Sequence, residues 1–337
     1  GQQDEDLNQE QKLAVDHALL ADDFFCLHGP PGTGKTRTLV EIVRRAAKSG
    51  RDVLVCADSN QAIDNILVGS STEGEVDDGS LHKYSQHGAE EFTVERRNTG
   101  RSSNRFVRKM YADSDVNRGD VVVSTNNSAA DIHRQFDLAV IDEATQATCT
   151  SCLIPISKSD KFVLAGDHKQ LPPYSAEEGP AQSEFGKSMF EHMYASGGVY
   201  ESVGIQLKTQ YRMHEEIVRF PNHGFYDGSL RNGRKVEETE EMDRPAVAYN
   251  LGGETEKIGT SYRNTTEAKM VERVVLRVIE EEGINSKNVG VITPYSAQVK
   301  EITRRLEGSG GEAATVDTID SFQGSEREAV VISFVRS

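Results

Sequence analysis

The octapeptide Gly29-Pro30-Pro31-Gly32-Thr33-Gly34-Lys35-Thr36 constrains the fold of this chain more than any other feature of its sequence. It matches the phosphate-binding pattern GxxxxGK(S/T) completely, and it lies between an apolar run at 24–27 and a helical pattern at 36–49. Glycines let backbone N–H groups surround phosphate oxygens, and a helix N-terminus favours bound anions. We therefore expect an α/β domain with a nucleotide site, in which Lys35 neutralises the β and γ phosphates and the Thr36 hydroxyl binds Mg²⁺.

Apolar runs elsewhere in the chain predict parallel sheets. A strand at 24–27, a helix at 36–49 and a strand at 52–57 form a βαβ unit, with Gly50 as the stop of its helix. Further strands are expected in two sets. The first set lies at 121–124, 138–142 and 162–165, and the second lies at 204–207, 246–251, 289–293 and 330–334, with a long helix at 266–282.

Residues 69–118 interrupt this alternation, because an acidic stretch is followed by a basic one and few apolar residues are present. We expect an insertion that lies off the sheet. Four arginines are spaced to share one face of a helix, and these are Arg97, Arg101, Arg105 and Arg108. The predicted domain plan is 1–68 and 119–203 for a first domain with the phosphate loop, 69–118 for the basic insertion, and 204–337 for a second domain.

One of the predicted strands ends in two carboxylates, Asp142 and Glu143. In P-loop enzymes the Asp that holds Mg²⁺ lies at such a strand end. Asp142 would take the metal, which leaves Glu143 to orient and deprotonate the attacking water. An exposed acidic strand end would look the same in isolation, so this interpretation depends on the pairing with the phosphate loop.

The chain is acidic, with 54 Asp and Glu against 38 Lys and Arg and a formal net charge of -16. Overall charge therefore cannot attract a polyanion, and any nucleic-acid site must be a local basic groove. An acidic surface that is poor in lysine is one way to stay soluble at high salt. It is compatible with a salt-adapted prokaryotic host.

Cysteine usage and hydropathy indicate an intracellular protein, cytoplasmic or nuclear. The chain has 4 Cys and no disulfide framework, which fits a reducing compartment. No apolar run approaches the roughly 18 residues of a membrane-spanning helix, and residues 1–6 do not resemble a signal peptide. Cys149 and Cys152 form a CxxC pair, but no second pair of ligands completes a zinc site. We expect neither membrane association nor a structural metal there.

Four further blocks go beyond a generic ATPase. They are Asp142-Glu143-Ala144-Thr145-Gln146, Gly166-Asp167-His168-Lys169-Gln170-Leu171-Pro172-Pro173, Gln210-Tyr211-Arg212-Met213-His214 and Asp320-Ser321-Phe322-Gln323-Gly324-Ser325-Glu326. In this order they resemble superfamily 1 helicases, in the 5′-to-3′ branch that contains the nonsense-mediated decay helicase, senataxin and the immunoglobulin-mu-binding helicase. The resemblance implies two tandem RecA-like P-loop domains with parallel sheets and an ATP site in the cleft between them. It also implies ATP-driven movement along single-stranded RNA or DNA.

The resemblance assigns roles around the nucleotide as well. Gln11 would read the adenine edge, and Tyr211 would pack near the adenine. Gln170 would sense the γ-phosphate, and Arg212 would reach across from the second domain as an arginine finger. Glu326 would contact the ribose or support the site from the second domain.

Other blocks resemble the motifs with which this family contacts a nucleic-acid strand. Hydroxyls, amides and helix N-termini suit phosphate contacts without base readout. The expected contact residues are Ser59, Asn60, Asn65, Thr125, Pro294, Tyr295 and Thr318. The family also contacts nucleic acid with an insertion at the place of 69–118, so Arg97 and Arg101 would form a clamp on the backbone. Each block alone stays ambiguous, because Ser and Asn are ordinary capping residues and a basic helix can simply be solvated.

Departures from the family pattern leave alternatives open. Asp58 stands where the family has Pro, and its carboxylate either weakens phosphate binding or faces away. A helix with a second catalytic Arg would follow Arg336, and a β-barrel would precede Leu7. We therefore expect a piece of a longer, monomeric motor whose flanking domains bind protein partners. The alternatives are an ATP-gated nucleic-acid clamp with little turnover and a P-loop ATPase that remodels proteins.

Overall fold

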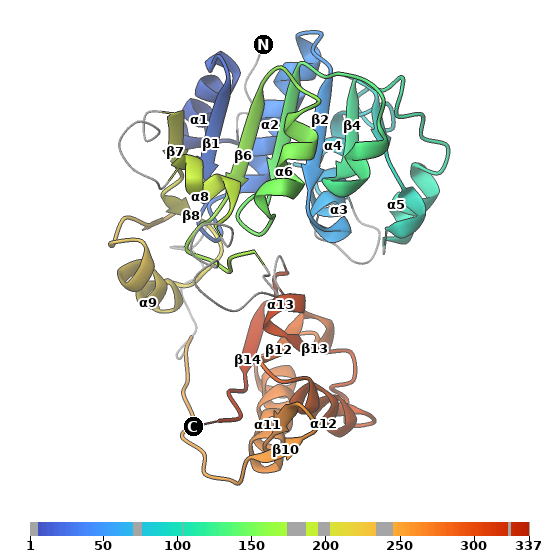
Figure 1. Ribbon diagram of the computed structural model, residues 1–337. Coiled ribbons are helices and arrows are strands. Elements are labelled where there is room, and N and C mark those ends of the chain that lie inside the picture. The colour runs from blue at the N-terminus through green and yellow to red at the C-terminus, as the bar shows by residue number, and fades with distance from the viewer. Residues whose placement is uncertain are drawn as a thin grey trace. The chain divides into compact units, whose positions relative to one another are not determined.

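A seven-stranded sheet organises the larger part of the molecule (Figure 1). The computed structural model describes residues 6–69, 76–102, 104–173, 187–194, 203–233, 245–322 and 325–336. The strands of this sheet are β1 (Phe24–His28), β2 (Val53–Ala57), β3 (Val94–Arg96), β4 (Val121–Thr125), β5 (Leu138–Asp142), β6 (Phe162–Gly166) and β7 (Gly204–Gln206). Their order is β3-β4-β2-β5-β6-β1-β7, and every pair is parallel. The strands predicted at 24–27, 52–57, 121–124, 138–142 and 162–165 are confirmed.

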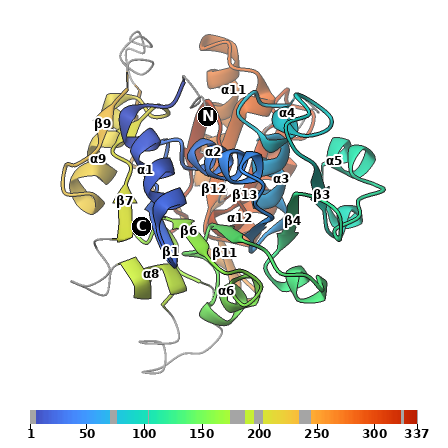
Figure 2. The ribbon, with the colours of Figure 1, turned by 90° about the horizontal axis from the view of Figure 1, so that it is seen from above.

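Both faces of this sheet are covered by helices, which is typical of parallel sheets (Figure 2). Val53 and Val55 face a core shared with α1 (Gln9–Leu20), α2 (Lys35–Lys48) and α3 (Asn60–Val68). Leu54 and Cys56 face the opposite core, shared with α6 (Cys149–Ile156) and α8 (Met189–Tyr194). The strands are therefore apolar on both faces, which explains why they appear in the sequence as continuous apolar runs.

The insertion contributes the edge strand β3 to this sheet, so the expectation that it lies off the sheet is wrong. It contains α4 (Leu81–Tyr84), β3, the short 3-10 helix η1 (Thr99–Arg101) and α5 (Arg105–Met110). β3 pairs with β4 as the edge strand, and Val94 is fully buried. Leu81, Val107 and Tyr111 join the same core. These few apolar residues are far apart in sequence, so no periodic pattern indicated them.

A smaller α/β unit follows. Its sheet has the parallel strands β12 (Val289–Thr293), β13 (Thr315–Thr318) and β14 (Ala329–Ile332) in the order β13-β12-β14. Helices α11 (Thr265–Glu281) and α12 (Ser296–Leu306) bury Val271, Val275 and Ile302 against it. A hairpin of β10 (Glu256–Ile258) and β11 (Ser261–Arg263) and the short helix α13 (Ile319–Phe322) complete the unit. The strand predicted at 246–251 is wrong, because this stretch is irregular and exposes Val247 and Tyr249.

The division between the two compact units lies between Ala246 and Val247, whereas the predicted domain boundary lies at 203/204. β7 pairs with β1 at the edge of the first sheet. The following elements, β8 (Thr209–Gln210), α9 (Glu215–Phe225) and β9 (Arg231–Asn232), also belong to the first unit. The apolar run at 204–207 therefore completes one sheet instead of starting the next. Across the described residues, none of the helices has the length and apolar character that crossing a bilayer requires.

Candidate nucleotide and nucleic-acid sites

The phosphate loop runs from the end of β1 into α2 at the carboxyl end of the first sheet. Gly32 and Gly34 have φ angles of +75° and +76°, in the left-handed region that favours glycine. A Cβ atom at Gly32 would also lie 2.7 Å from the Cβ of Arg212, and one at Gly34 would collide with the Gln11 amide. Both glycines are thus required by the turn and by the side chains that approach it. The other predicted loop residues, Gly29, Pro31 and Thr33, lie in the same turn.

Lys35, the first residue of α2, lies between the two carboxylates at the end of β5. Its Nζ is 2.8 Å from Asp142 Oδ1 and 2.6 Å from Glu143 Oε1. Burial alone would lower the pKa of Lys35, but the charges on the two carboxylates raise it above its usual value. Burial raises the pKa of Asp142, while Lys35 opposes this shift and Glu143 adds to it. The side chains assigned to phosphate, metal and water therefore meet at one point.

Glu143 has a backbone conformation that is uncommon for its residue type. Its φ angle is 51°, in the left-handed region, which costs roughly 1–2 kcal/mol for a residue with a Cβ atom. The side chain is held from two directions, because Oε1 accepts from Lys35 and Oε2 accepts from Gln146 Nε2 at 2.8 Å. Strained residues that their surroundings fix in place are typical of functional sites. This geometry supports Glu143 as the general base and adds Gln146 as its partner, a role that the sequence did not indicate.

Thr36 and Asp142 offer a hydroxyl and a carboxylate, which are oxygen ligands of the kind Mg²⁺ prefers. Asp142 is 3% exposed, and its Oδ1 accepts hydrogen bonds from Lys35 and from the Glu143 backbone N–H, the latter at 2.8 Å. A cationic group therefore already contacts this carboxylate. The residues fit Mg²⁺ that arrives with a nucleotide, once Lys35 moves from Asp142 to the phosphates. The ion would neutralise the phosphate oxygens there.

A second group of side chains lies beside the phosphate loop, where the adenine site is expected. Gln11 is buried and donates from Nε2 to the Thr33 carbonyl oxygen at 3.0 Å. It forms a capping box with Asn8, whose Nδ2 donates to Tyr211 Oη at 2.8 Å. Tyr211 in turn donates its backbone N–H to the Gly32 carbonyl at 2.9 Å. The structure brings Gln11 and Tyr211 together and adds Asn8 as the link, for which the capping pattern was the available signal.

Arg212 belongs to the first unit, so the expectation that it reaches across from the second domain is wrong. Its backbone N–H donates to Gln210 Oε1 at 2.9 Å, and its Cβ lies against Gly32. Burial lowers the pKa of Arg212, and the negative charge of Glu143 opposes that shift. An arginine stays charged under these conditions. The physical reason for its position is β7, which returns the chain to the edge of β1 and leads the following residues past the phosphate loop.

Gln170 and Glu326 are the other two predicted nucleotide contacts. Both are exposed, and they belong to different units. Gln170 is exposed in the loop after β6, and its Nε2 donates to Asp167 Oδ2 at 2.8 Å. A primary amide has a second N–H, so Gln170 keeps one donor for another acceptor. Glu326 is exposed in the second unit, and its contact with the ribose stays a prediction.

Two of the predicted strand-contacting blocks lie side by side at the carboxyl edge of the first sheet. They follow β2 and β4, and the Asn126 backbone N–H donates to the Ala57 carbonyl at 2.9 Å. Ser59 caps α3 by accepting the Ala62 N–H at 3.1 Å, and Thr125 is the last residue of β4. Within α3, Asn65 is half-buried and Asn60 binds the insertion through its side chain.

Asp58, the departure from the family pattern, is directed to the other side of the sheet. Its Oδ1 accepts a hydrogen bond from Ser151 Oγ at 3.1 Å. Ser151 lies on α6, which covers the opposite face from α3. This contact supports the alternative in which the carboxylate faces away from the α3 N-terminus.

The arginines of the insertion do not share one helix face, so that prediction is wrong. Arg97 follows β3, Arg101 ends η1, and a new helix begins only at Arg105. Asn98 has a φ angle of 56°, and Asn104 caps α5, so the chain turns twice between these arginines. Arg97 Nη2 lies 3.3 Å from Asp131 Oδ2, whereas Arg101 is exposed.

Arg96 anchors the insertion to the predicted strand-contacting block. It is 1% exposed, and its guanidinium donates to Asp64 Oδ1 and to Asn60 Oδ1, each at 3.0 Å. We expect Arg96→Ala to lower the free energy of unfolding by about 3–5 kcal/mol, because it leaves the buried Asp64 charge uncompensated. Urea unfolding measures this loss. Arg97→Ala is the matched control, since its ion pair is more exposed and should contribute about 1 kcal/mol or less. Equal losses in the two variants would contradict the assignment.

The remaining predicted contacts lie together on the second unit. Pro294 and Tyr295 follow β12, and Thr318 ends β13, which pairs with β12 so that Thr293 lies opposite Thr318. The ring of Tyr262 lies 5.3 Å from that of Tyr295, and the Arg336 guanidinium lies over Tyr262 at 4.8 Å. Aromatic rings beside an arginine are the groups on which single-stranded bases stack. Sequence reasoning did not find Tyr262 or Arg336, because no motif includes them.

The geometry of the phosphate loop, Lys35 and the two carboxylates defines a P-loop nucleotide site, and comparisons with known proteins agree. Two family models, each described as an AAA domain, match the chain. The first matches residues 6–86 and 71–177, and the second matches residues 185–337. An uncharacterized ATP-dependent helicase of Methanocaldococcus jannaschii is 32% identical over 99% of this chain and 64% of its own length. The ATP-dependent helicase NAM7 of Saccharomyces cerevisiae is 33% identical over 98% of this chain and 38% of its own length. The DNA-binding protein SMUBP-2 of Rattus norvegicus is 30% identical over 98% of this chain and 40% of its own length.

The chain therefore belongs to the AAA-domain family of superfamily 1 helicases. It spans less than two thirds of the length of each of these relatives.

Proposed function

We propose that this chain is the motor part of an ATP-dependent helicase or translocase that moves 5′ to 3′ along a single strand of RNA or DNA. The observation that carries this proposal is the convergence of Lys35, Asp142 and Glu143 within 2.8 Å contacts, with Arg212 beside the same loop. The strand-contacting blocks at the carboxyl edge of the same sheet support it. We further propose that the motor acts as a monomer and uses Mg²⁺, with Thr36 and Asp142 as ligands.

In the proposed reaction the protein residues act on ATP and one water molecule. Lys35 leaves the two carboxylates and binds the β and γ phosphates. Glu143 Oε1, released from Lys35, accepts a proton from the water, whose oxygen attacks the γ-phosphorus as the bond to the β-phosphate oxygen breaks. Gln146 holds the other carboxylate oxygen of Glu143 in place. Arg212 stabilises the charge that develops on the transferred phosphoryl group.

ATP turnover by this chain, alone and with single-stranded RNA or DNA, tests the proposal. We expect turnover that one polymer stimulates, and we expect Lys35→Ala to abolish it. ATP-sensitive strand binding without turnover would instead favour the clamp. Turnover that neither polymer changes would favour an ATPase acting on proteins. A strand-displacement assay with 5′ and 3′ overhangs then tests the direction of movement.

Charge reversal in the insertion tests its role on the nucleic acid. We expect Arg97→Glu, Arg101→Glu and Arg105→Glu together to weaken strand binding and to flatten the plot of log affinity against log salt. Each phosphate that a cationic side chain neutralises adds about 0.7 to the slope for a single strand, so removal of three such side chains should reduce it by about 2. The control reverses three exposed charges on α11, namely Lys269, Arg273 and Arg277. A slope that changes equally in both triple variants would reflect net charge alone.

A further inference from the structure

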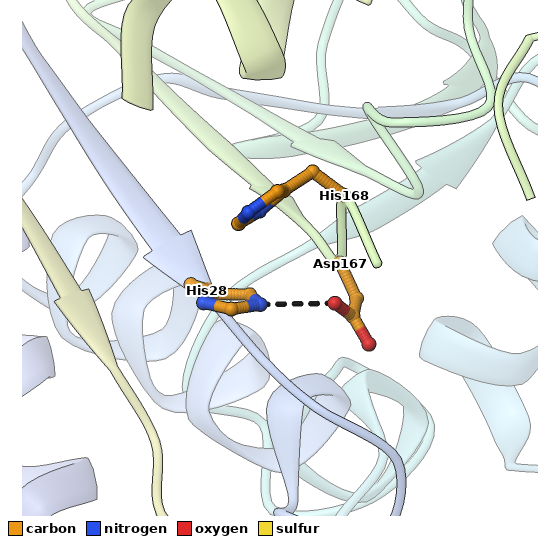
Figure 3. Close-up of side chains that lie close together, drawn as sticks. All are labelled: His28, Asp167 and His168. Carbon is orange, nitrogen blue, oxygen red and sulfur yellow. Dashed lines mark hydrogen bonds and ion pairs between the residues drawn. The ribbon is translucent and has the colours of Figure 1, made fainter. Parts of the chain in front are cut away.

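Near the phosphate loop, one buried carboxylate accepts hydrogen bonds from side chains of three segments of the chain. Asp167 follows β6 and is 2% exposed. His28, the last residue of β1, lies with its Nε2 2.9 Å from Asp167 Oδ1 (Figure 3). Gln170 Nε2 donates to Oδ2 at 2.8 Å, and Tyr226 Oη donates to the same oxygen at 2.6 Å. An ionised carboxylate only accepts hydrogen bonds, so His28 carries its proton on Nε2.

The carboxylate of Asp167 is fully used by these donors. The backbone N–H of Lys169 adds a further hydrogen bond to Oδ1 at 3.1 Å. Four donors thus occupy the roughly four acceptor positions of an ionised carboxylate. Burial alone would raise the pKa of Asp167, but the hydrogen bonds from His28, Tyr226 and Gln170 lower it below its usual value. Asp167 is therefore a buried negative charge that hydrogen bonds stabilise.

A metal ion is a poorer interpretation of this cluster. The ligand atoms of His28, Asp167 and His168 lie within 4.8 Å of one another, which is compatible with a metal site. However, a metal on Asp167 would have to displace the hydrogen bond from His28. The His28 and His168 rings are also 4.7 Å apart and tilted by 44°, with one ring over the other (Figure 3). Burial lowers the pKa of His168 to about 4, so this neutral ring packs over His28.

The side-chain partners of Asp167 lie on segments that also lead to residues we assign to the γ-phosphate. His28 immediately precedes the phosphate loop, and Gln170 is itself the proposed sensor. Tyr226 follows the last residue of α9, and this helix begins three residues after Arg212. The backbone N–H of Asp167 also donates to Thr145 Oγ1 at 3.3 Å, two residues after Glu143.

We propose that Asp167 is a positioning residue that transmits γ-phosphate contact at Gln170 to helix α9 through Tyr226. This inference rests on the proposed function for the role of Gln170. Because Asp167 holds one N–H of the Gln170 amide, the amide has a fixed orientation and presents its second N–H to the phosphate. A shift of Gln170 towards the phosphate pulls on a carboxylate that also holds Tyr226. The α9 segment, with Arg212 ahead of it, then responds to the nucleotide state.

Tyr226→Phe tests the proposal, because it removes one hydroxyl and keeps the ring. Tyr111→Phe is the matched control: Tyr111 is 2% exposed, and its hydroxyl lies 3.0 Å from His82 Nδ1 inside the insertion. The first measurement is steady-state ATP turnover with the stimulating polymer. We expect Tyr226→Phe to lower kcat by about 10- to 100-fold with KM for ATP changed less than about two-fold, as misplaced catalytic groups do. Tyr111→Phe should leave kcat unchanged at a comparable loss of stability.

The second measurement is hydrogen exchange with ADP and with ATPγS, which requires binding but no turnover. In the wild type, exchange in α9 should be slower with ATPγS than with ADP, and in Tyr226→Phe this difference should disappear while the protection of the phosphate loop persists. Wild-type protein without any turnover would refute the proposed function, and the exchange data alone would then decide on Asp167. An α9 that responds equally in wild type and Tyr226→Phe, or that never responds, would overturn the proposal.

Discussion

Glu143→Gln should leave ATP bound to the protein and reduce its turnover by about 10²- to 10⁴-fold, the usual contribution of a general base. The amide has almost the same shape as the carboxylate but cannot accept a proton from water. Lys35 keeps its contact with Asp142 in this variant, so the site should stay intact. Removal of a negative charge beside the triphosphate should also leave ATP affinity equal or higher, since like charges repel. Turnover by rapid quench and affinity by a fluorescent ATP analogue measure the two effects.

The control for this variant is Glu281→Gln, which removes a carboxylate from the exposed face of α11. It should turn over ATP at the wild-type rate. Glu143→Gln that hydrolyses ATP within ten-fold of wild type would show that another group takes the proton. Loss of ATP binding would instead mean that the substitution disturbs the left-handed turn at this residue, and hydrolysis would then have to be compared at saturating ATP.

Arg212→Ala should lower kcat by about 10³- to 10⁵-fold, the range found for arginine fingers in phosphoryl transfer. Its guanidinium stays charged beside the charge of Glu143, and its Cβ lies against Gly32 of the phosphate loop. The loss should be in the transition state, so ATP should bind with an affinity close to that of the wild type. Single-turnover hydrolysis and ATP binding separate the two quantities.

Arg277→Ala is the control for Arg212→Ala, because it removes an exposed arginine from α11. Arg212→Lys is also informative, since lysine keeps the charge but loses the planar fork of donors. We expect little rescue from lysine. A lysine variant as fast as the wild type would reduce the role of Arg212 to general electrostatics, and a normal rate in Arg212→Ala would remove it from the mechanism.

The core of the first unit could be predicted from sequence because its strands are buried on both faces. The run Val53 to Ala57 is continuously apolar and is followed by Asp58, and the run from Leu138 ends at Asp142. The carboxyl end of the sheet, where both runs stop, carries the site. The phosphate loop and the carboxylates could be predicted because each depends on a short, local pattern next to a strand.

The parts that were predicted wrongly depend on long-range contacts. β3 is a strand because its backbone pairs with β4, and the side chain of Arg96 binds Asp64 and Asn60. Nothing local to Val94 in the sequence indicates either contact. β7 looks like the start of a new domain until its pairing with β1 is known. Gln146 and Asp167 lie inside recognised blocks, but their roles depend on which atoms they meet, and a linear pattern does not give those partners.

Lys35 contacts the two carboxylates at the nucleotide site, so a metal ion that binds there would have to replace it. Two carboxylates at the end of β5 are already neutralised in part by a cation of the chain itself, at 2.8 Å and 2.6 Å. Free Mg²⁺ must compete with that lysine, so we expect weak metal binding without nucleotide, and joint entry of ion and triphosphate. In the proposed cycle, release of the products would return Lys35 to the carboxylates, which would spare the protein a buried uncompensated charge worth several kcal/mol. For the proposed motor we therefore expect ATP affinity to be the difference between two sets of ion pairs, and we expect the set that re-forms to assist product release.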